Sequence, residues 1–201
     1  MAERNRVTPF GAIVAIEQRG RFLGNRGSIH RGHEVVRPWQ VRRWITCALE
    51  HKGWVAPKWE PGRWTALFFW DEAVALAAGH RPCALCRRPD FDRWMDGWAA
   101  ATGERPTVDP VDRRLHAERT DGRGPRRHRY PWRELPVGTF VAVDDVALLV
   151  LEDRLVPWTP VAAGYGTPVA RPARGDATLL TPPSIVAVLA AGYRPQLATT
   201  W

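Results

Sequence analysis

Short apolar runs in the first part of the chain alternate with glycine-containing polar segments and predict β-strands. Residues 10–16 (FGAIVAI) and 21–24 (RFLG) read as two strands joined by a turn, and residues 65–69 (TALFF) read as a buried strand. Residues 37–50 place apolar side chains at mixed spacing, so the pattern there does not distinguish a helix from a strand. The start of the chain is therefore expected to consist mainly of strands and turns.

Helical spacing predominates in the middle of the chain. Residues 70–79 (WDEAVALAAG) predict a short helix, with Asp71 as its cap and Gly79 at its end. A second helix is expected from positions 89–90, because apolar side chains then recur every three or four residues. A third is expected to open at Asp109, which is followed by a proline.

The last third of the chain returns to short β-rich runs separated by Asp-Asp, Pro and Gly turns, and ends in a helix that begins near residues 182–184. These runs predict a small meander or barrel. We therefore expect an α+β fold with two parts: an α/β domain over residues 1–120, and a β-rich region over residues 121–201 that follows a basic loop.

Composition indicates the kind of partner. The 201 residues carry a formal net charge of +8, 27 of the 29 basic residues are arginine, and there are 11 tryptophans. Positive charge with stacking groups favours nucleic acid, DNA more than RNA, although tryptophans that fill a core and a basic surface without a ligand are the alternative. No apolar run approaches the roughly 18 residues of a membrane span. We therefore expect no membrane partner and a cytoplasmic location.

The three cysteines lie in two segments that suit one metal ion. Cys83 and Cys86 form a C-x-x-C pair, and Cys47 and His51 form a C-x3-H pair further upstream. Thiolate and imidazole ligands at such spacings are typical of tetrahedral zinc, so we predict a Cys3His zinc site that staples the front part of the chain. The alternative is that Cys47 is a buried apolar residue and His51 a surface residue.

The stretch TALFFWDEAVALAAGHRPCALCRRPD resembles part of the zinc-binding domain of the bacterial Ada methyl-phosphotriester DNA repair protein. In that family a short strand, a helix ending in an alanine–alanine–glycine run and a C-x-x-C pair occur in the same order, and the first ligand pair, C-x3-C, lies upstream. The resemblance covers about residues 45–90. This chain has C-x3-H at the place of the first pair.

The resemblance implies a zinc ion with four protein ligands, contact with the DNA backbone, and a zinc-bound thiolate that accepts a methyl group from a phosphotriester. Cys47 stands at the place of the accepting cysteine and is the implied catalytic residue. Because His51 replaces a thiolate, the metal centre carries one negative charge fewer than in the family, and Cys47 is expected to be a weaker nucleophile. Zinc that supports another activity is the alternative.

A second arrangement competes for the catalytic role. Zinc-dependent base deaminases combine H-x-E with P-C-x-x-C, and this chain contains His116–Glu118 and Pro82–Cys86 in the reverse order. Glu118 is then the proton-transferring group of a hydrolase or deaminase acting on a base or nucleotide. A noncatalytic, zinc-stabilised interaction domain is a further alternative, so the sequence leaves open whether the protein is an enzyme.

Arginines near glycine-rich turns and beside the cysteines are the predicted contacts to nucleic-acid phosphates, because guanidinium groups bind phosphate oxygens in pairs. The predicted residues are Arg26, Arg81, Arg87, Arg88, Arg123, Arg126, Arg127 and Arg129. Those from Arg123 onward belong to the basic loop, which is expected to be exposed.

Overall fold

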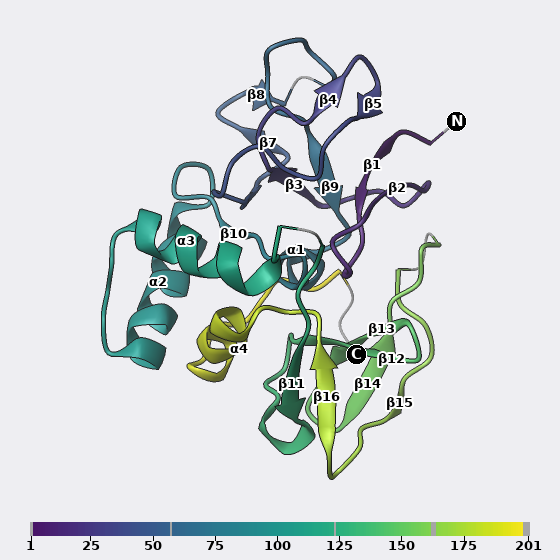
Figure 1. Ribbon diagram of the computed structural model, residues 1–201, viewed down its shortest axis with the longest axis vertical. Helices are drawn as coiled ribbons and strands as arrows, with labels where there is room; N and C mark the ends of the chain where they lie inside the picture. Colours follow the sequence, from purple (N-terminus) through teal and green to yellow (C-terminus); the bar gives the residue numbers. More distant parts are fainter. Residues whose placement is uncertain (1, 57, 123, 162–163, 199–201) are drawn as a thin grey trace.

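The computed structural model describes residues 2–56, 58–122, 124–161 and 164–198, and it has an α+β fold (Figure 1). Strands and helices occur in the order that the apolar pattern predicts, with a strand-rich beginning, a helical middle and a second strand-rich part. None of the helices in the described ranges has the length and apolar character needed to span a membrane.

The front sheet is mixed and has the strand order β10-β6-β3-β9-β1-β2. Its strands are β1 (Arg4–Val7), β2 (Ile13–Ala15), β3 (Phe22–Asn25), β6 (Ile45–Cys47), β9 (Leu67–Phe69) and β10 (Arg81–Pro82). β6 runs parallel to β10, and β1 runs parallel to β9. Two hairpins lie outside this sheet: β4 (His30–Arg31) with β5 (Glu34–Val35), and β7 (Glu50–His51) with β8 (Trp54–Val55).

Close packing at the centre of the front sheet explains a glycine in a strand. Gly24 lies in β3, and a Cβ atom there would come within 2.4 Å of the ring of Phe69 on β9. The undecided segment 37–50 is irregular up to residue 44 and then forms the strand β6, which pairs with β3 on one side and with β10 on the other. Pairing partners distant in sequence, which local spacing does not reveal, therefore decide its conformation.

The helices are α1 (Glu72–Ala77), α2 (Arg88–Thr102), α3 (Val108–Arg119) and α4 (Pro183–Ala190). The predicted cap of the first helix is confirmed, since the Asp71 carboxylate accepts a hydrogen bond of 3.0 Å from the Val74 amide. The predicted start of α3 is wrong by two residues: Thr107, and not Asp109, is the cap residue, and Asp109 lies in the first turn. In the first turn, its negative charge still interacts favourably with the helix dipole.

The back sheet is antiparallel throughout, with the order β11-β16-β12-β13-β14-β15. Its strands are β11 (His128–Pro131), β12 (Phe140–Val143), β13 (Val146–Val150), β14 (Arg154–Pro157), β15 (Val169–Ala170) and β16 (Asp176–Leu179), and a 3-10 turn covers Trp132–Glu134. β12 to β15 form a meander. β11 and β15 remain unpaired to each other, so the sheet does not close into a barrel.

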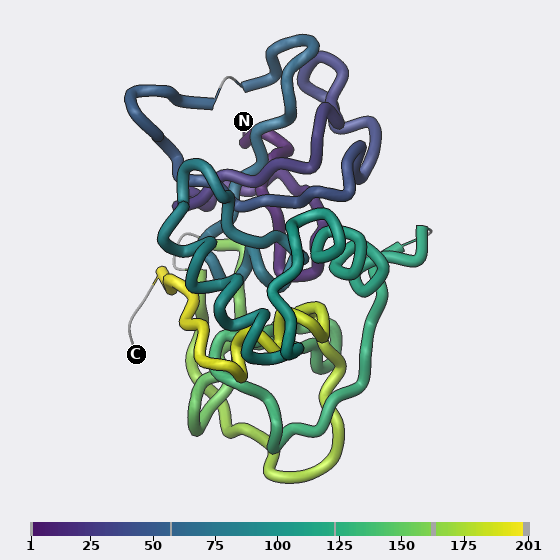
Figure 2. Tube along the Cα trace, turned by 90° about the vertical axis from the view of Figure 1, so that its left-hand side faces the viewer, coloured from purple at the N-terminus to yellow at the C-terminus, as the bar shows by residue number. Residues whose placement is uncertain are grey.

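The helices and the two sheets share their cores. Trp94 of α2, Leu115 of α3 and Ile185 of α4 belong to one buried cluster, while Phe69 and Phe140 join the front and back sheets in another. Figure 2 shows the result from the side, with the front sheet above, the helices between and the back sheet below. Each predicted part thus has its own sheet, and α4 of the second part packs on helices of the first.

Candidate metal centre and basic pocket

The parallel pairing of β6 with β10 brings Cys47 next to Cys83. Ile45 pairs with Arg81 and Thr46 with Pro82, and the Cys83 amide donates a hydrogen bond of 3.0 Å to the Thr46 carbonyl. Each cysteine therefore stands one position beyond the paired residues at the same end of two neighbouring strands. Sequence spacing alone gives the C-x-x-C pair, whereas strand register supplies the third thiol.

The turn after β10 adds Cys86 to this pair. The Arg87 amide donates to the Cys83 carbonyl at 3.1 Å, and the Leu85 amide donates to the Cys83 sulfur at 3.4 Å. As a result the sulfur atoms of Cys47, Cys83 and Cys86 all lie within 4.8 Å of one another. Cys83 is buried, and the other two are half-buried.

The three thiols fit the requirements of a zinc ion. Zn–S bonds of about 2.3 Å in a tetrahedron put two sulfur ligands about 3.8 Å apart, so small side-chain movements close this group on one ion. Hydrogen bonds from Cys47 and Cys86 lower the pKa of Cys83, while the hydrogen bond to Cys83 raises the pKa of Cys47. Without a cation, the thiols therefore share protons around one stabilised thiolate, which is the form that binds metal.

The other predicted ligand, His51, does not belong to this group. It lies in β7, at the start of a hairpin, and within the described ranges the cluster contains cysteines only. Three of the four predicted ligands are thus brought together.

Glu118 and His116 lie on α3 and likewise have no place in the described cysteine cluster. The Glu118 carboxylate accepts hydrogen bonds from the amide and hydroxyl of Ser184 at the start of α4 and pairs with Arg114. Its observed role is to cap that helix. The H-x-E arrangement needed for a deaminase is therefore not assembled at the thiols.

Two of the predicted phosphate contacts are internal. The Arg81 guanidinium forms two hydrogen bonds, 2.9 and 2.8 Å long, with the Asp112 carboxylate, and Arg81 is 2% exposed. Arg87 is 4% exposed and pairs with Glu72 and Asp90 at 2.8 Å. Their assignment to a nucleic-acid surface is wrong, because buried carboxylates occupy both guanidinium groups.

The remaining predicted arginines differ in position. Arg88 is exposed and pairs with Asp92, while Arg129 lies in β11 and donates to Thr178 and to the Asp176 carbonyl. Arg123 lies outside the described residues. Arg26, Arg126 and Arg127 come together, since all three line one pocket between the front sheet, α1 and the loop after α3.

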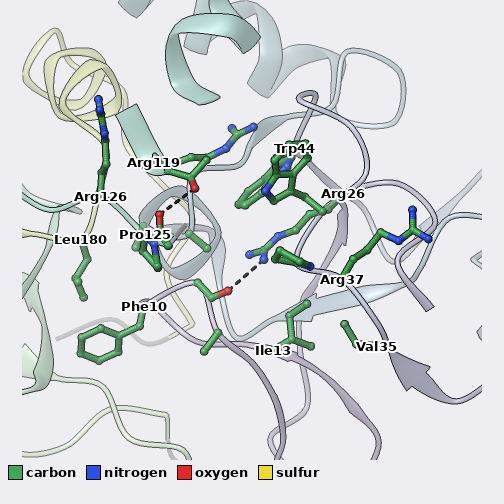
Figure 3. Close-up of a pocket in the computed structure, with 18 of the residues that line it drawn as sticks. Phe10, Ile13, Arg26, Val35, Arg37, Trp44, Arg119, Pro125, Arg126 and Leu180 are labelled. Atoms are coloured by element: carbon green, nitrogen blue, oxygen red, sulfur yellow. Dashed lines mark hydrogen bonds between the residues drawn. The ribbon is translucent and has the colours of Figure 1, made fainter. Parts of the chain in front are cut away.

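This basic pocket has a volume of about 590 Å³ (Figure 3). Among the described residues, six arginines and no acidic residue line it: Arg4, Arg26, Arg37, Arg119, Arg126 and Arg127. Apolar side chains form much of the remaining wall, including Phe10, Ile13, Val35, Trp39 and Leu180. Figure 3 shows the Arg26 side chain reaching towards the segment that follows Phe10, whereas Arg37 and Arg126 extend away from the centre.

Trp44 lies at the base of this pocket against two buried guanidinium groups. The guanidinium carbons of Arg26 and Arg119 are each 4.0 Å from the centre of the Trp44 ring. The His80 ring is 5.1 Å from the same indole. Burial, with the nearby charges of Arg26 and Arg119, lowers the pKa of His80 well below its usual value. The ring is therefore neutral and adds no further positive charge.

Arg26 has only neutral partners. It is 2% exposed, and it donates to His80 Nε2 at 3.3 Å and to the Gly11 carbonyl at 3.1 Å. Its Nη2 atom is buried and has no hydrogen-bond partner among the described residues. Burial lowers the pKa of Arg26 to about 9, so the group still carries its charge at neutral pH.

The arginines of this pocket share one feature of their pairing. Elsewhere, some exposed arginines have carboxylate partners, as in Arg88–Asp92, Arg105–Asp96 and Arg154–Asp153, whereas others, such as Arg31 and Arg174, form no ion pair among the described residues. In the part of the chain that the structure describes, none of the six pocket arginines forms such a pair. Six arginines without carboxylate partners therefore lie together at this face.

Sequence reasoning missed most of this pocket. Trp44 and His80 directly precede the strands that carry the cysteine segments, and Arg119 closes α3, but no local pattern marks them as neighbours. The excess of arginine over acidic residues is the one sequence signal of such a site, and this excess does not show where in the chain the site lies.

Comparisons of the chain with protein-family models, with curated proteins and with solved structures found no match. The functional conclusions therefore depend on the geometry of these two sites.

Proposed function

We propose that this protein is a zinc-containing nucleic-acid-binding protein that acts in DNA repair or processing. The observation that carries the zinc part is the group of three thiols at the ends of β6 and β10. Cys47, Cys83 and Cys86 would hold the ion, which would fix the strand pair and keep the thiols deprotonated. Three thiolates leave one of four tetrahedral positions for His51 or a water molecule.

Metal analysis of single variants tests the zinc part. Wild-type protein is expected to carry one zinc ion per chain, and Cys83→Ser is expected to carry almost none, because it removes the central buried thiolate. His116→Gln serves as the matched control and should keep full occupancy.

Cobalt(II) substitution then identifies the fourth ligand. A change of the cobalt spectrum in His51→Gln assigns that position to His51, and an unchanged spectrum assigns it to solvent. Full zinc occupancy in Cys83→Ser would contradict the proposed site.

The nucleic-acid part is supported by the unpaired arginines of the pocket face. The exposed ones, Arg4, Arg37, Arg126 and Arg127, surround the mouth of the pocket, and the net charge of the chain is +8. Guanidinium groups without carboxylate partners can bind phosphates without first breaking an ion pair. A strand of DNA following this face would meet positive charge and the half-buried Trp39 ring.

Salt-dependent binding to single- and double-stranded DNA tests this part. The logarithm of the binding constant is expected to fall with the logarithm of salt concentration, by about 0.7–0.9 for each phosphate contact. The triple variant Arg37→Ala, Arg126→Ala, Arg127→Ala should bind more weakly and with a shallower slope. The matched control, Arg88→Ala, Arg105→Ala, Arg154→Ala, removes three arginines that have carboxylate partners and should bind as the wild type does. Equal losses in both triple variants would contradict a specific face.

Methyl acceptance by Cys47 is a second candidate activity, favoured by the half-buried position of this sulfur beside two further thiols. The Cys47 thiolate would attack the methyl carbon of a methyl phosphotriester, so that an S–C bond forms, the C–O bond breaks and the phosphodiester leaves with the electron pair. Mass spectrometry after incubation with methyl-phosphotriester DNA should then find one added methyl group on the peptide containing Cys47. An unmodified peptide would exclude this activity while leaving zinc and DNA binding untouched.

A further inference from the structure

Two positively charged groups lie buried together at the base of the basic pocket, and among the described residues neither forms an ion pair with a carboxylate. Arg26 donates only to His80 and to a backbone carbonyl, and Arg119 donates to the carbonyls of Gly79 and Arg42 and contacts His116. The Asp112 carboxylate acts electrostatically on Arg119, but it already accepts two hydrogen bonds from Arg81. A buried charge of this kind is costly unless an opposite charge joins it.

Arg26 and Arg119 both line the cavity, together with the turn at Gly11. The buried, unpartnered Nη2 atom of Arg26 lies next to this turn, at 4.0 Å from the position that a Cβ atom of residue 11 would take. A rotation of the guanidinium group away from the Gly11 carbonyl would turn Nη2 and its neighbour towards the cavity. The planar fork of two donors then matches two oxygens of a phosphate group.

The walls indicate what the anion carries. Phe10, Ile13, Val35 and Leu180 make part of the lining apolar, and Trp39 offers an aromatic face. The volume of about 590 Å³ falls among those of small-molecule sites. A phosphate within a continuous strand has a nucleotide on both sides, whereas a terminal phosphate has one, so the end of a strand can enter a pocket more readily.

We propose that the basic pocket binds a phosphate monoester attached to a nucleoside, either a free nucleotide or the 5′-phosphorylated end of a nucleic-acid strand, with its phosphate on Arg26. This inference deepens the proposed nucleic-acid function and rests on it for the choice of a nucleoside as the attached group. The rim arginines Arg37, Arg126 and Arg127 would hold the following phosphates of a strand.

Calorimetric titration with free ligands tests the pocket itself. Deoxyadenosine 5′-monophosphate is expected to bind at least about 10-fold more tightly than deoxyadenosine, because charge-assisted hydrogen bonds contribute most of the affinity. Arg26→Met should weaken nucleotide binding about 10- to 100-fold. Its melting temperature should be unchanged or higher, since the variant removes an unpaired buried charge.

Ala12→Glu is a second variant, and it leaves the buried core unchanged. Ala12 is exposed and lines the pocket, so a carboxylate there would compete with the phosphate for the arginines. It should weaken nucleotide binding at least about 10-fold without lowering the melting temperature. The control Arg154→Met, in the back sheet, should leave binding unchanged.

Oligonucleotides with and without a 5′-phosphate distinguish the two sources of the ligand. Tighter binding of the phosphorylated strand, lost in Arg26→Met, supports the strand end as the ligand. Binding of the free nucleotide without binding of either strand supports the pocket and overturns the proposed nucleic-acid function. Equal binding of both strands, unchanged in Arg26→Met and Ala12→Glu, together with no nucleotide binding, overturns the pocket while the nucleic-acid function stands.

Discussion

Buried arginines in two adjoining regions of this protein have opposite surroundings. Arg81 and Arg87, between the front sheet and the helices, are each neutralised by carboxylates, whereas Arg26 and Arg119, at the base of the basic pocket, have neutral acceptors. His80 and Arg81 are adjacent in the chain and belong to different sides of this division. Guanidinium groups of the same kind thus hold the fold together in one region and remain able to accept an external anion in the other.

The largest difference between the two arginine groups is expected in the free energy of unfolding. Arg81→Met leaves the Asp112 carboxylate buried with only the longer contact of 3.8 Å to Arg43, and it should lower the free energy of unfolding by about 3–5 kcal/mol. Arg26→Met leaves no carboxylate without a partner, so its free energy of unfolding should be unchanged or higher. Denaturant unfolding of both variants measures the contrast. The double variant Arg81→Met, Asp112→Leu should recover part of the loss, and equal costs for Arg81→Met and Arg26→Met would remove the distinction.

A smaller effect on stability is expected from the protonation of His116, beside the basic pocket. Burial, followed by repulsion from Arg119 and Arg42, lowers the pKa of His116 to about 4, against 6.5 in an unfolded chain. Between these values the unfolded state binds a proton that the folded state does not, so stability should increase as pH rises from about 4 to about 6.5. Urea unfolding across this range should show a weaker pH dependence in His116→Gln. An identical dependence in wild type and variant would exclude His116 as its source.

Much of the fold can be predicted from local sequence, whereas the division between the two arginine groups cannot. Asp71 before α1 and Pro182 before α4 mark helix starts that the apolar pattern alone already indicates. The α+β prediction is confirmed; strands β12 to β15 of the back sheet form a meander, and the sheet stays open. Arg81 and Asp112, by contrast, are far apart in sequence and meet only after β10 and α3 have packed. No spacing rule identifies which arginine acquires such a partner.

The candidate metal centre shows the same limit. Cys83 and Cys86 are recognisable as a pair because a single turn joins them, and Cys47 joins them through the register of β6 and β10. His51 has a suitable spacing from Cys47, but pairing with Trp54 places it in a separate hairpin. Spacing therefore suggests four ligands, and strand register brings three of them together.

The smallest effect is expected at an arginine outside both groups. Arg88 is exposed at the start of α2 and pairs with Asp92 four residues later. Arg88→Ala should lower the free energy of unfolding by no more than about 0.5 kcal/mol and leave the zinc content unchanged. A loss comparable to that of Arg81→Met, measured in the same unfolding experiment, would show that exposure does not separate the arginines of this protein.

The parallel pair β6–β10 has a consequence for how this sequence can change over time. Two residues separate Trp44 from Cys47, and two separate His80 from Cys83, so the ring contact and the thiol contact lie at opposite ends of intervals of equal length. A deletion or insertion of one residue in either interval would misalign one end whenever the other is kept in place. Evolutionary drift in these two short strands is therefore restricted to substitutions, even if only one of the two sites is under selection.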